Sequence, residues 1–544
     1  MNGPVIDGPV VHGTVVHGPV GVVGAGTMGA GIAQVAAVAG RRVLIADAVP
    51  GAAARAVAAV RDRVKAQVAK GRLSVAPDAL NLTAVESVAG LAGCAVVIEA
   101  VVEDLAVKRS LFAELEAVVA ADAILASNTS SLSPTALAAG LTSPRRLVGL
   151  HFFNPVPAMR LVEVISGLAT APEVADAAAG LAAEWGKTVV RSTATPGFIV
   201  NRVARPFYAE AWRLYEEHAT VPQHIDAVLT GGGGFRMGPF ALMDLIGHDV
   251  NEAVTRSVWA AFGHDPRFAP SLAQRALVEA GWLGRKAGYG VYPAEGAPAP
   301  EPAPAAPPPS AVIEHAAHRA ARKPSTAGEH GASGEHGVAV GRERSPLRPL
   351  LDRAGVAIVP GDRDDTGAGL PDDLVELPSG ALLVLCEGVT ATSLSAAFER
   401  PVIVADRVLD PVAATAIAIA ASDGCPPAAA AEAVGLLQAA GLDVYLIDDT
   451  PGLIVTRTVA MLANLAADAL ACRVATEPDI DNAMRLGVNY PLGPLAWARQ
   501  WGIGTVLRIL DSLDDWYRDG RYRPSPLLRR TALAHRTSMT GSQP

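Results

Sequence analysis

Short apolar runs alternate with longer helical stretches along the first part of the chain. The strand-like runs are 19–23, 42–46, 95–100 and 123–127. Alternation of this kind predicts a doubly wound sheet of parallel strands with helices on its faces. Ligands bind at the carboxyl ends of such strands, so polar residues that follow a strand are the first candidates for a site.

The pattern changes to helical periodicity at Thr195, and helices are expected over 197–217 and 221–230. The sequence therefore predicts a Rossmann-type α/β domain over 19–194, followed by an all-α domain over 195–293. Residues 1–18 are broken by Gly and Pro and are expected to form a disordered tail.

The second half of the chain repeats the first in a reduced form. When the sequence is shifted by 255 positions, Thr195-Pro196-Gly197 falls on Thr450-Pro451-Gly452, and no gap is needed as far as Gly493-Pro494. A second all-α domain is therefore expected over 450–535, with a tail at 536–544. Before it, a truncated Rossmann-like segment without a glycine loop is expected over 346–449, and a Pro/Ala-rich linker over 294–345.

Composition and charge narrow the class of protein. The chain of 544 residues is too long for a single core, and its net charge of −9 gives no basic surface for nucleic acid. The sequence contains no apolar run of eighteen or more residues, so no membrane span is indicated. No set of metal ligands is visible in it. The four scattered cysteines fit reduced thiols in a cytoplasmic protein.

A glycine loop follows the first strand. Gly24, Gly26 and Gly29 have the spacing that allows a tight turn, backbone approach to a pyrophosphate, and close packing of helix on strand. The N–H groups of the next helix, which begins near Thr27 and Met28, would face the phosphates. Asp47 ends the second strand, where a carboxylate accepts hydrogen bonds from the ribose hydroxyls. The loop therefore predicts NAD as the cofactor.

A histidine and a glutamate lie further along, in the stretch HFFNPVPAMRLVEVI. The imidazole of His151 can take the proton of an alcohol as hydride leaves the carbon, because it titrates near neutrality. A carboxylate such as Glu163 can fix the tautomer of that ring. Together with the glycine loop, this pair indicates a dehydrogenase.

Five separated motifs resemble the 3-hydroxyacyl-CoA dehydrogenase family: GAGTMGAGIA, EAVVEDLAVK, SNTSSL, HFFNPVPAMRLVEVI and TPGFIVNR. The resemblance implies NAD, an L-3-hydroxyacyl-CoA substrate and a 3-oxoacyl-CoA product. It also implies that His151 is the base, Glu163 its orienting carboxylate, and Ser130 and Asn201 the residues that contact the substrate. Further residues carried over as cofactor contacts are Glu103, Lys108, Asn154 and Lys286, and those carried over as coenzyme A contacts are Lys65 and Lys70.

The tail motif DIDNAMRLGVNYPLGPLAWARQWG resembles the long bacterial members of this family that act on 3-hydroxybutyryl-CoA or 3-hydroxyadipyl-CoA in phenylacetate degradation. In the second copy, Asp406 falls near the position of His151 and Thr456 replaces Asn201. We therefore expect this copy to be inactive, to pack on the first helical domain as an internal pseudo-dimer, and to help shape the acyl pocket. A homo-oligomer of the whole chain is left open.

Two other functions fit the same scaffold. One is a dehydrogenase of a free hydroxy acid or sugar acid, which would not need the thioester. The other is a non-catalytic NAD-binding protein, which the presence of His151, Glu163, Ser130 and Asn201 together argues against.

Overall fold

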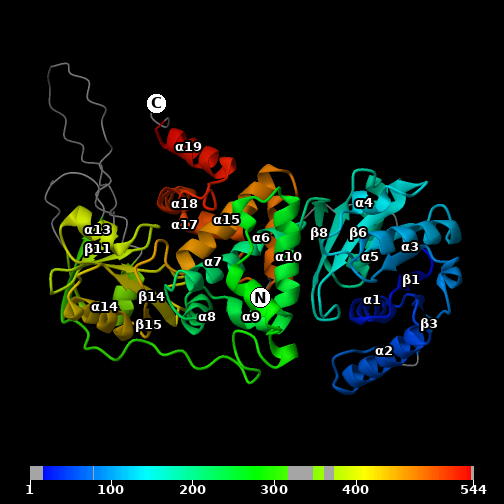
Figure 1. The fold of residues 1–544 in the computed structure, drawn as a ribbon, viewed down its shortest axis with the longest axis horizontal. Coiled ribbons are helices and arrows are strands. Elements are labelled where there is room, and N and C mark those ends of the chain that lie inside the picture. The colour runs from blue at the N-terminus through cyan, green and yellow to red at the C-terminus, as the bar shows by residue number, and fades with distance from the viewer. Residues whose placement is uncertain (1–15, 77–78, 317–346, 361–372, 541–544) are drawn as a thin grey trace, which may run out of the picture.

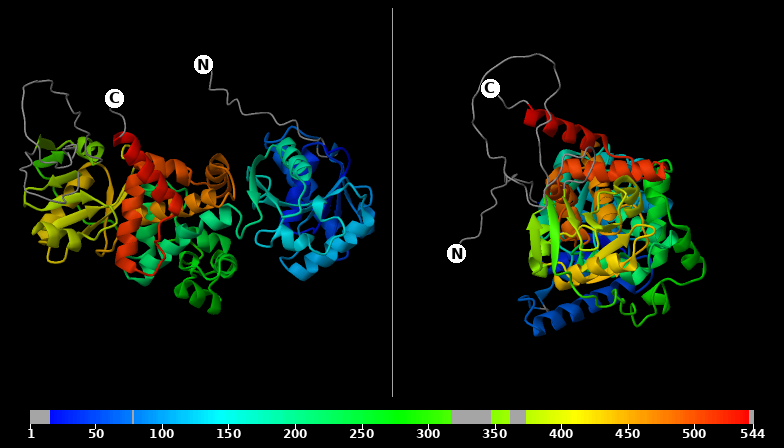
Figure 2. Two further views of the ribbon diagram at one scale, coloured as in Figure 1. Left: turned by 90° about the horizontal axis from the view of Figure 1, so that it is seen from above. Right: turned by 90° about the vertical axis from the view of Figure 1, so that its left-hand side faces the viewer.

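Two α/β lobes flank a block of helices in the computed structural model, which describes residues 16–76, 79–316, 347–360 and 373–540. The first lobe, blue to cyan, and the second lobe, yellow-green, lie at opposite ends of the helical block (Figures 1 and 2). Most of the expected N-terminal tail and much of the expected linker fall outside the described residues. No helix in the described ranges is both long and apolar enough to cross a membrane.

The first lobe contains an eight-stranded sheet in the order β3-β2-β1-β4-β5-β6-β7-β8. Its strands are β1 (Val20–Val23), β2 (Val43–Ala46), β3 (Leu82–Ala84), β4 (Val96–Glu99), β5 (Ile124–Ser127), β6 (Leu147–Phe152), β7 (Leu161–Ser166) and β8 (Thr188–Thr193). Neighbouring strands are parallel, except that β7 runs antiparallel to β6. This one reversal places His151 directly opposite Glu163.

Helices cover both faces of this sheet (Figure 1). They are α1 (Thr27–Val38), α2 (Ala52–Ala69), α3 (Leu105–Val118), α4 (Pro134–Ala138) and α5 (Pro172–Glu184), with short 3₁₀ turns at Val88–Leu91 and Pro144–Arg146. Alternate residues of a strand point to opposite faces, so Val20 and Val22 join one apolar cluster and Val23 joins the other. The predicted doubly wound α/β class is confirmed.

The helical block begins at Val200. Its first part consists of α6 (Val200–Val203), α7 (Arg205–Glu216), α8 (Pro222–Gly231), α9 (Pro239–Ile246), α10 (His248–Ala261) and α11 (Leu272–Glu279), with 3₁₀ turns at Pro266–Phe268 and Arg285–Ala287. Its second part consists of α15 (Val455–Ala471), α16 (Glu477–Gly487), α17 (Pro494–Trp501), α18 (Ile503–Tyr517) and α19 (Pro526–Thr540).

Corresponding residues of the two parts make corresponding contacts. The carboxylate of Asp226 accepts hydrogen bonds from the first N–H groups of α9, and Asp481, 255 positions later, does the same at α17. Aspartate at this place satisfies backbone donors that the helix itself cannot pair.

The second lobe contains a seven-stranded sheet in the order β10-β9-β11-β12-β13-β14-β15. Its strands are β9 (Ala311–Ala316), β10 (Ala357–Pro360), β11 (Asp373–Glu376), β12 (Leu382–Leu385), β13 (Val402–Ala405), β14 (Ala416–Ala421) and β15 (Asp443–Leu446). The helices of this lobe are α12 (Arg348–Ala354), α13 (Ala391–Phe398) and α14 (Pro427–Ala439).

The expected linker is partly structured. Strand β9 lies within 294–345 and pairs with β10 and β11, so this segment adds a strand to the second sheet. The physical reason is the short apolar run that follows the proline stretch, in which Val312 is buried in the core of the lobe. The strand order from β12 to β15 repeats that from β5 to β8, including the one antiparallel pair.

Candidate active site

The three glycines of the loop between β1 and α1 differ in what surrounds them. A Cβ on Gly24, whose φ is +103°, would lie 2.5 Å from the carbonyl oxygen of Ala100, and a Cβ on Gly29 would lie 1.8 Å from that of Gly24. These two glycines are therefore required by the turn and by the packing of α1. A Cβ on Gly26 would meet no atom within 4 Å. The space in front of Gly26 is open, as a loop that receives a pyrophosphate requires.

Asp47 lies at the end of β2 beside this loop. One carboxylate oxygen accepts a hydrogen bond from the N–H of Ala25 at 2.6 Å, and the other accepts one from Val49 at 2.8 Å. The first turn of α1, with Thr27 and Met28, faces the same opening, and Thr27 is exposed. The loop, the helix N-terminus and the carboxylate thus meet as an NAD site requires.

His151 on β6 and Glu163 on β7 form a buried pair. The Nδ1 atom of His151 lies 2.7 Å from Oε2 of Glu163, and the glutamate side chain is fully buried. An ionised carboxylate can only accept a hydrogen bond, so Nδ1 carries a hydrogen, and in the neutral ring Nε2 then carries the free lone pair. The ring of Phe153 lies 4.4 Å from the imidazole ring and that of Phe198 lies 6.0 Å from it, measured between centroids.

The second oxygen of Glu163 ties this pair to the helical block. Oε1 accepts hydrogen bonds from the N–H groups of Ile199 and Val200, both at 3.1 Å, where α6 begins. Asn201 lies in that helix, and its side-chain amide donates to the backbone oxygen of Ser130 at 3.2 Å. His151, Glu163, Ser130 and Asn201 are therefore brought together from β6, β7, the loop after β5, and α6.

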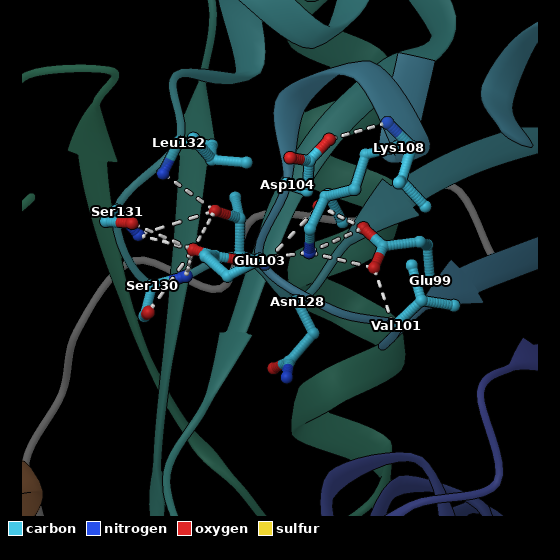
Figure 3. A network of polar contacts seen from close by, with 12 residues as sticks. Glu99, Val101, Glu103, Asp104, Lys108, Asn128, Ser130, Ser131 and Leu132 are labelled. Carbon is cyan, nitrogen blue, oxygen red and sulfur yellow. Dashed lines mark hydrogen bonds and ion pairs between the residues drawn. The ribbon is translucent and has the colours of Figure 1, made fainter. Parts of the chain in front are cut away.

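An ion-pair network supports the loop that carries Ser130 (Figure 3). The ammonium of Lys108 contacts both oxygens of Glu99, at 2.8 and 3.1 Å, and Oε2 of Glu103 at 2.9 Å. Oε1 of Glu103 accepts hydrogen bonds from the N–H groups of Ser130 and Ser131, both at 2.9 Å. Burial raises the pKa of Glu103, but Lys108 and the hydrogen bonds from this loop outweigh that effect and lower the pKa to about 2.

Lys108 is only 1% exposed, and its ammonium is surrounded by these two carboxylates. A direct contact with a cofactor, as the sequence suggests, would require the ammonium to leave one of them. In this geometry Lys108 holds Glu103, and Glu103 holds the Ser130 loop.

The remaining residues expected in the site lie on three other segments. Lys286 is on the helical block, where its ammonium contacts Asp249 at 2.5 and 2.7 Å. Lys65 is exposed on α2, and Lys70 is exposed just after its end. Asn154 is exposed in the turn after β6.

Asn128, in the polar run that follows β5, accepts a hydrogen bond from the N–H of Phe152 at 2.8 Å and so joins the ends of β5 and β6. Sequence reasoning passed over two residues of this region. One is Glu99, which anchors Lys108 and ends β4, and its place at the end of a strand is the signal that could have found it. The other is Gly487 of α16: a Cβ there would lie 2.7 Å from Leu161 and 3.7 Å from Phe153. Only the tertiary structure reveals that contact.

The second lobe has Asp406 where the first has His151. Asp406 is 255 positions later, and its carboxylate accepts hydrogen bonds at 2.7–2.9 Å from the N–H groups of Ile454, Val455 and Thr456, which begin α15. Ala418 stands at the position of Glu163. The aspartate therefore takes over the capping of the helix that Glu163 performs in the first copy, and this place holds no imidazole.

Family models match most of the chain. The model described as "3-hydroxyacyl-CoA dehydrogenase, NAD binding domain" matches residues 19–195, and "3-hydroxyacyl-CoA dehydrogenase, C-terminal domain" matches 197–294 and 452–543. "3-hydroxybutyryl-CoA dehydrogenase reduced Rossmann-fold domain" matches 383–451. The two C-terminal matches fall on the two parts of the helical block.

Several known proteins are similar to this chain. The 3-hydroxyadipyl-CoA dehydrogenase of Escherichia coli K12 is 44% identical over 505 residues, which cover 92% of this chain and 94% of that protein. The probable 3-hydroxybutyryl-CoA dehydrogenase of Bacillus subtilis is 40% identical over 48% of this chain and 92% of its own length. The crystal structure of 3-hydroxybutyryl-CoA dehydrogenase from Escherichia coli K12 superposes with a TM-score of 0.80 at 42% identity, covering 96% of this chain and 99% of that one.

Proposed function

The chain belongs to the 3-hydroxyacyl-CoA dehydrogenase family and oxidises a 3-hydroxyacyl-CoA with NAD as acceptor, and we propose that His151 and Glu163 carry out the proton transfer of this reaction. The observation that carries the proposal is the 2.7 Å contact between Nδ1 of His151 and a fully buried carboxylate. In the neutral ring, that contact leaves the lone pair of Nε2 available to the substrate hydroxyl.

Nε2 takes the hydroxyl proton as the alcohol becomes a carbonyl, and it returns the proton in the reverse direction. The imidazolium formed in this step is stabilised by the carboxylate of Glu163, which two backbone N–H groups already hold in place. The nicotinamide ring, when bound, accepts the hydride. Burial of the pair excludes water and strengthens these interactions.

Ser130 and Asn201 complete the reacting centre in this proposal. The two residues are linked by the hydrogen bond from the Asn201 amide to the Ser130 backbone oxygen. The Ser130 hydroxyl can then donate to the substrate oxygen while His151 holds its proton. The Glu103 carboxylate fixes the loop that presents Ser130, which makes it a positioning residue as well as a candidate cofactor contact.

NAD is assigned to the glycine loop. The open space at Gly26 and the N-terminus of α1, with Thr27 and Met28, would take the pyrophosphate, and Asp47 would take the ribose. The remaining cofactor contacts, Lys108, Asn154 and Lys286, and the coenzyme A contacts, Lys65 and Lys70, rest on the family resemblance.

The acyl group is proposed to be 3-hydroxybutyryl or 3-hydroxyadipyl, because relatives that match most of the chain carry both names. The experiment that tests the function measures initial rates of NAD reduction with 3-hydroxybutyryl-CoA, 3-hydroxyhexanoyl-CoA, 3-hydroxyadipyl-CoA and free 3-hydroxybutyrate. The free acid is expected to be inert. A rate with it equal to that of the thioester would favour the dehydrogenase of a free hydroxy acid.

We also propose that the two helical parts form an internal pseudo-dimer. Reciprocal contacts support this: Thr193 N–H donates to Val474 O at 2.9 Å, and Asp448 N–H donates to Ala219 O at 2.9 Å. Asp448 lies 255 positions after Thr193, and Val474 lies 255 positions after Ala219. The donor of each bond therefore corresponds to the donor of the other, and the two bonds run in opposite directions between the two parts. Such exchange is what a two-fold relation produces.

In this arrangement α16 of the second part lies against β7 and β8 of the first lobe. Gly487 lies close to Phe153, since a Cβ on it would be 3.7 Å from that side chain. The ring of Phe153 lies beside the imidazole of His151. The second part therefore contributes to the wall of the acyl pocket in our proposal.

A further inference from the structure

A buried arginine of the helical block has no acidic partner among the described residues. Arg205, the first residue of α7, is 4% exposed, and its Nε atom has no hydrogen-bond partner in the described part of the chain. Its Nη1 atom donates to the hydroxyl of Thr255 at 3.0 Å, and its guanidinium lies over the ring of Tyr208, 4.9 Å from the centroid.

These contacts leave the charge of Arg205 uncompensated. The hydroxyl of Thr255 is neutral, and an aromatic face carries only a partial negative charge. Burial raises the pKa of the Tyr208 phenol, so this group does not supply an anion at neutral pH. An arginine side chain stays protonated in proteins, and a buried charge needs a counter-charge.

Arg205 also lines a small cavity. Its volume is about 30 Å³, enough for a monatomic ion or one or two water molecules. The cavity is lined from α7, α10 and α11, and from Arg521 of the second helical part. The Nε atom of Arg521 also has no hydrogen-bond partner among the described residues.

Two arginines, Arg205 and Arg521, therefore line one cavity, and Glu216 is the one acidic residue among the residues that line it. Glu216 is exposed, and its Oε1 atom is engaged by the Ser271 hydroxyl at 2.7 Å and the Ala273 N–H at 3.1 Å. Within the described ranges it makes no ion pair of 4 Å or less with either arginine, so it does not neutralise the buried one.

We propose that this cavity binds a halide-sized inorganic anion, chloride in the cell, held by Arg205. A water molecule would accept a hydrogen bond from the guanidinium but would not neutralise its positive charge. An anion would do both. Arg521 belongs to the second helical part, so the bound anion would also fasten that part to the first. The site is separate from the dehydrogenase site, since its lining includes none of the residues assigned to that site.

The test uses the full chain in buffers where chloride replaces gluconate, an anion too large for the cavity, at constant ionic strength. We expect the Tm to rise with chloride and to saturate, because a ligand that binds only the folded state stabilises it by mass action. At ten times the Kd the unfolding equilibrium constant is expected to fall about tenfold. In Arg205→Met the chloride dependence is expected to be lost.

Arg202→Met is the matched control. Arg202 is equally buried, its Nε atom has no partner among the described residues, and it lies 4.9 Å over the ring of Phe262, but it does not line this cavity. Its variant should keep the chloride dependence. Equal dependence in wild type and Arg205→Met, or none in wild type, would overturn the proposal.

Bromide supplies a readout that needs no variant. Crystals of the wild type soaked in bromide should show an anomalous peak within hydrogen-bond distance of Arg205. A cavity without such a peak at saturating bromide would contradict the assignment even if Arg205→Met failed to fold. Arg521→Gln, a milder change, is expected to weaken the chloride dependence without abolishing it.

Discussion

One hydrogen bond decides which nitrogen of His151 can act. Glu163 occupies Nδ1 and is itself held by the backbone at the start of α6, so the ring presents Nε2 in a fixed direction. In the proposed mechanism the base is thereby oriented before the substrate arrives, and little reorganisation is needed during proton transfer.

The first prediction concerns this base. His151→Gln is expected to lower kcat by about 10²- to 10⁴-fold, the usual contribution of a positioned acid–base group. Affinity for NADH, measured by fluorescence titration, should stay nearly unchanged, because the glycine loop lies on β1 and α1, away from β6. Glu163→Gln keeps the shape of the side chain but removes its charge, and its kcat should lie between those of wild type and His151→Gln. Turnover that survives in His151→Gln would show that another group is the base.

The second prediction follows from the low pKa of Glu103. Its pKa in the folded state is about 2, below the ordinary value of 4.5, so the carboxylate stabilises the fold above pH 4.5 and this stabilisation is lost as the pH falls from 4.5 to 2. The side chain is about one-third exposed, and with a discount for solvent screening the effect is about 1–2 kcal/mol.

Urea unfolding at pH 5.5 and pH 3 measures this effect. Glu103→Gln should be less stable than wild type at pH 5.5, and the gap should narrow at pH 3. Glu114→Gln, which removes a charge from the exposed face of α3, is the control and should show no such convergence. A gap that is the same at both pH values would refute the role given to Glu103.

At the scale of elements, the turn between β1 and α1 contains Gly29, which the packing of α1 requires, and Gly26, which faces open space. This difference gives the third prediction. In Gly29→Ala the new methyl group meets the oxygen of Gly24, so α1 must shift, and both Tm and NADH affinity should fall. In Gly26→Ala the methyl group enters open space, so Tm should hold while NADH binding weakens by roughly 1–3 kcal/mol. Unchanged NADH affinity in Gly26→Ala would mean that the phosphates lie elsewhere.

Helix α15 depends on a carboxylate in the same way that α6 depends on Glu163. The fourth prediction is that Asp406→Ala lowers the free energy of unfolding by at least about 2 kcal/mol, because three buried N–H groups lose their acceptor. Since Asp406 lies in the second lobe, kcat of the protein that remains folded should be close to that of wild type. A large loss of kcat with unchanged stability would instead assign chemistry to the second copy.

At the scale of the whole molecule, the sequence predicted the parts that depend on local pattern. The sequence shows the strand, glycine loop and helix at 19–34 because these elements follow from neighbouring residues. It shows the repeat at an offset of 255 residues because the two stretches share residues at matching positions. Strand β9 was not predicted, since its pairing partners lie more than 40 residues away, across the segment that precedes β10. The contact of Gly487 with Leu161 and the burial of Lys108 between two carboxylates also escaped, because both are products of tertiary packing.

The two helical parts share one core, and the fifth prediction concerns what happens when they are separated. Phe207 and Phe235 of the first part pack on Tyr490 and Trp497 of the second, and the hydroxyl of Tyr522 donates to buried Glu210 at 2.7 Å. A protein that ends at residue 294 would expose these apolar side chains as one surface. Exposed patches of this kind drive association.

We therefore expect the protein ending at residue 294 to aggregate or to associate with itself, because only another chain can then cover that surface. Size-exclusion chromatography with light scattering, together with the rate of NAD reduction, tests this. Removal of residues 541–544 alone is the control and should leave a protein like wild type. A monodisperse monomer with full activity would show that the second half is dispensable. It would also contradict the pseudo-dimer, because the apolar surface of the first helical part would then be stable in water without the second helical part to cover it.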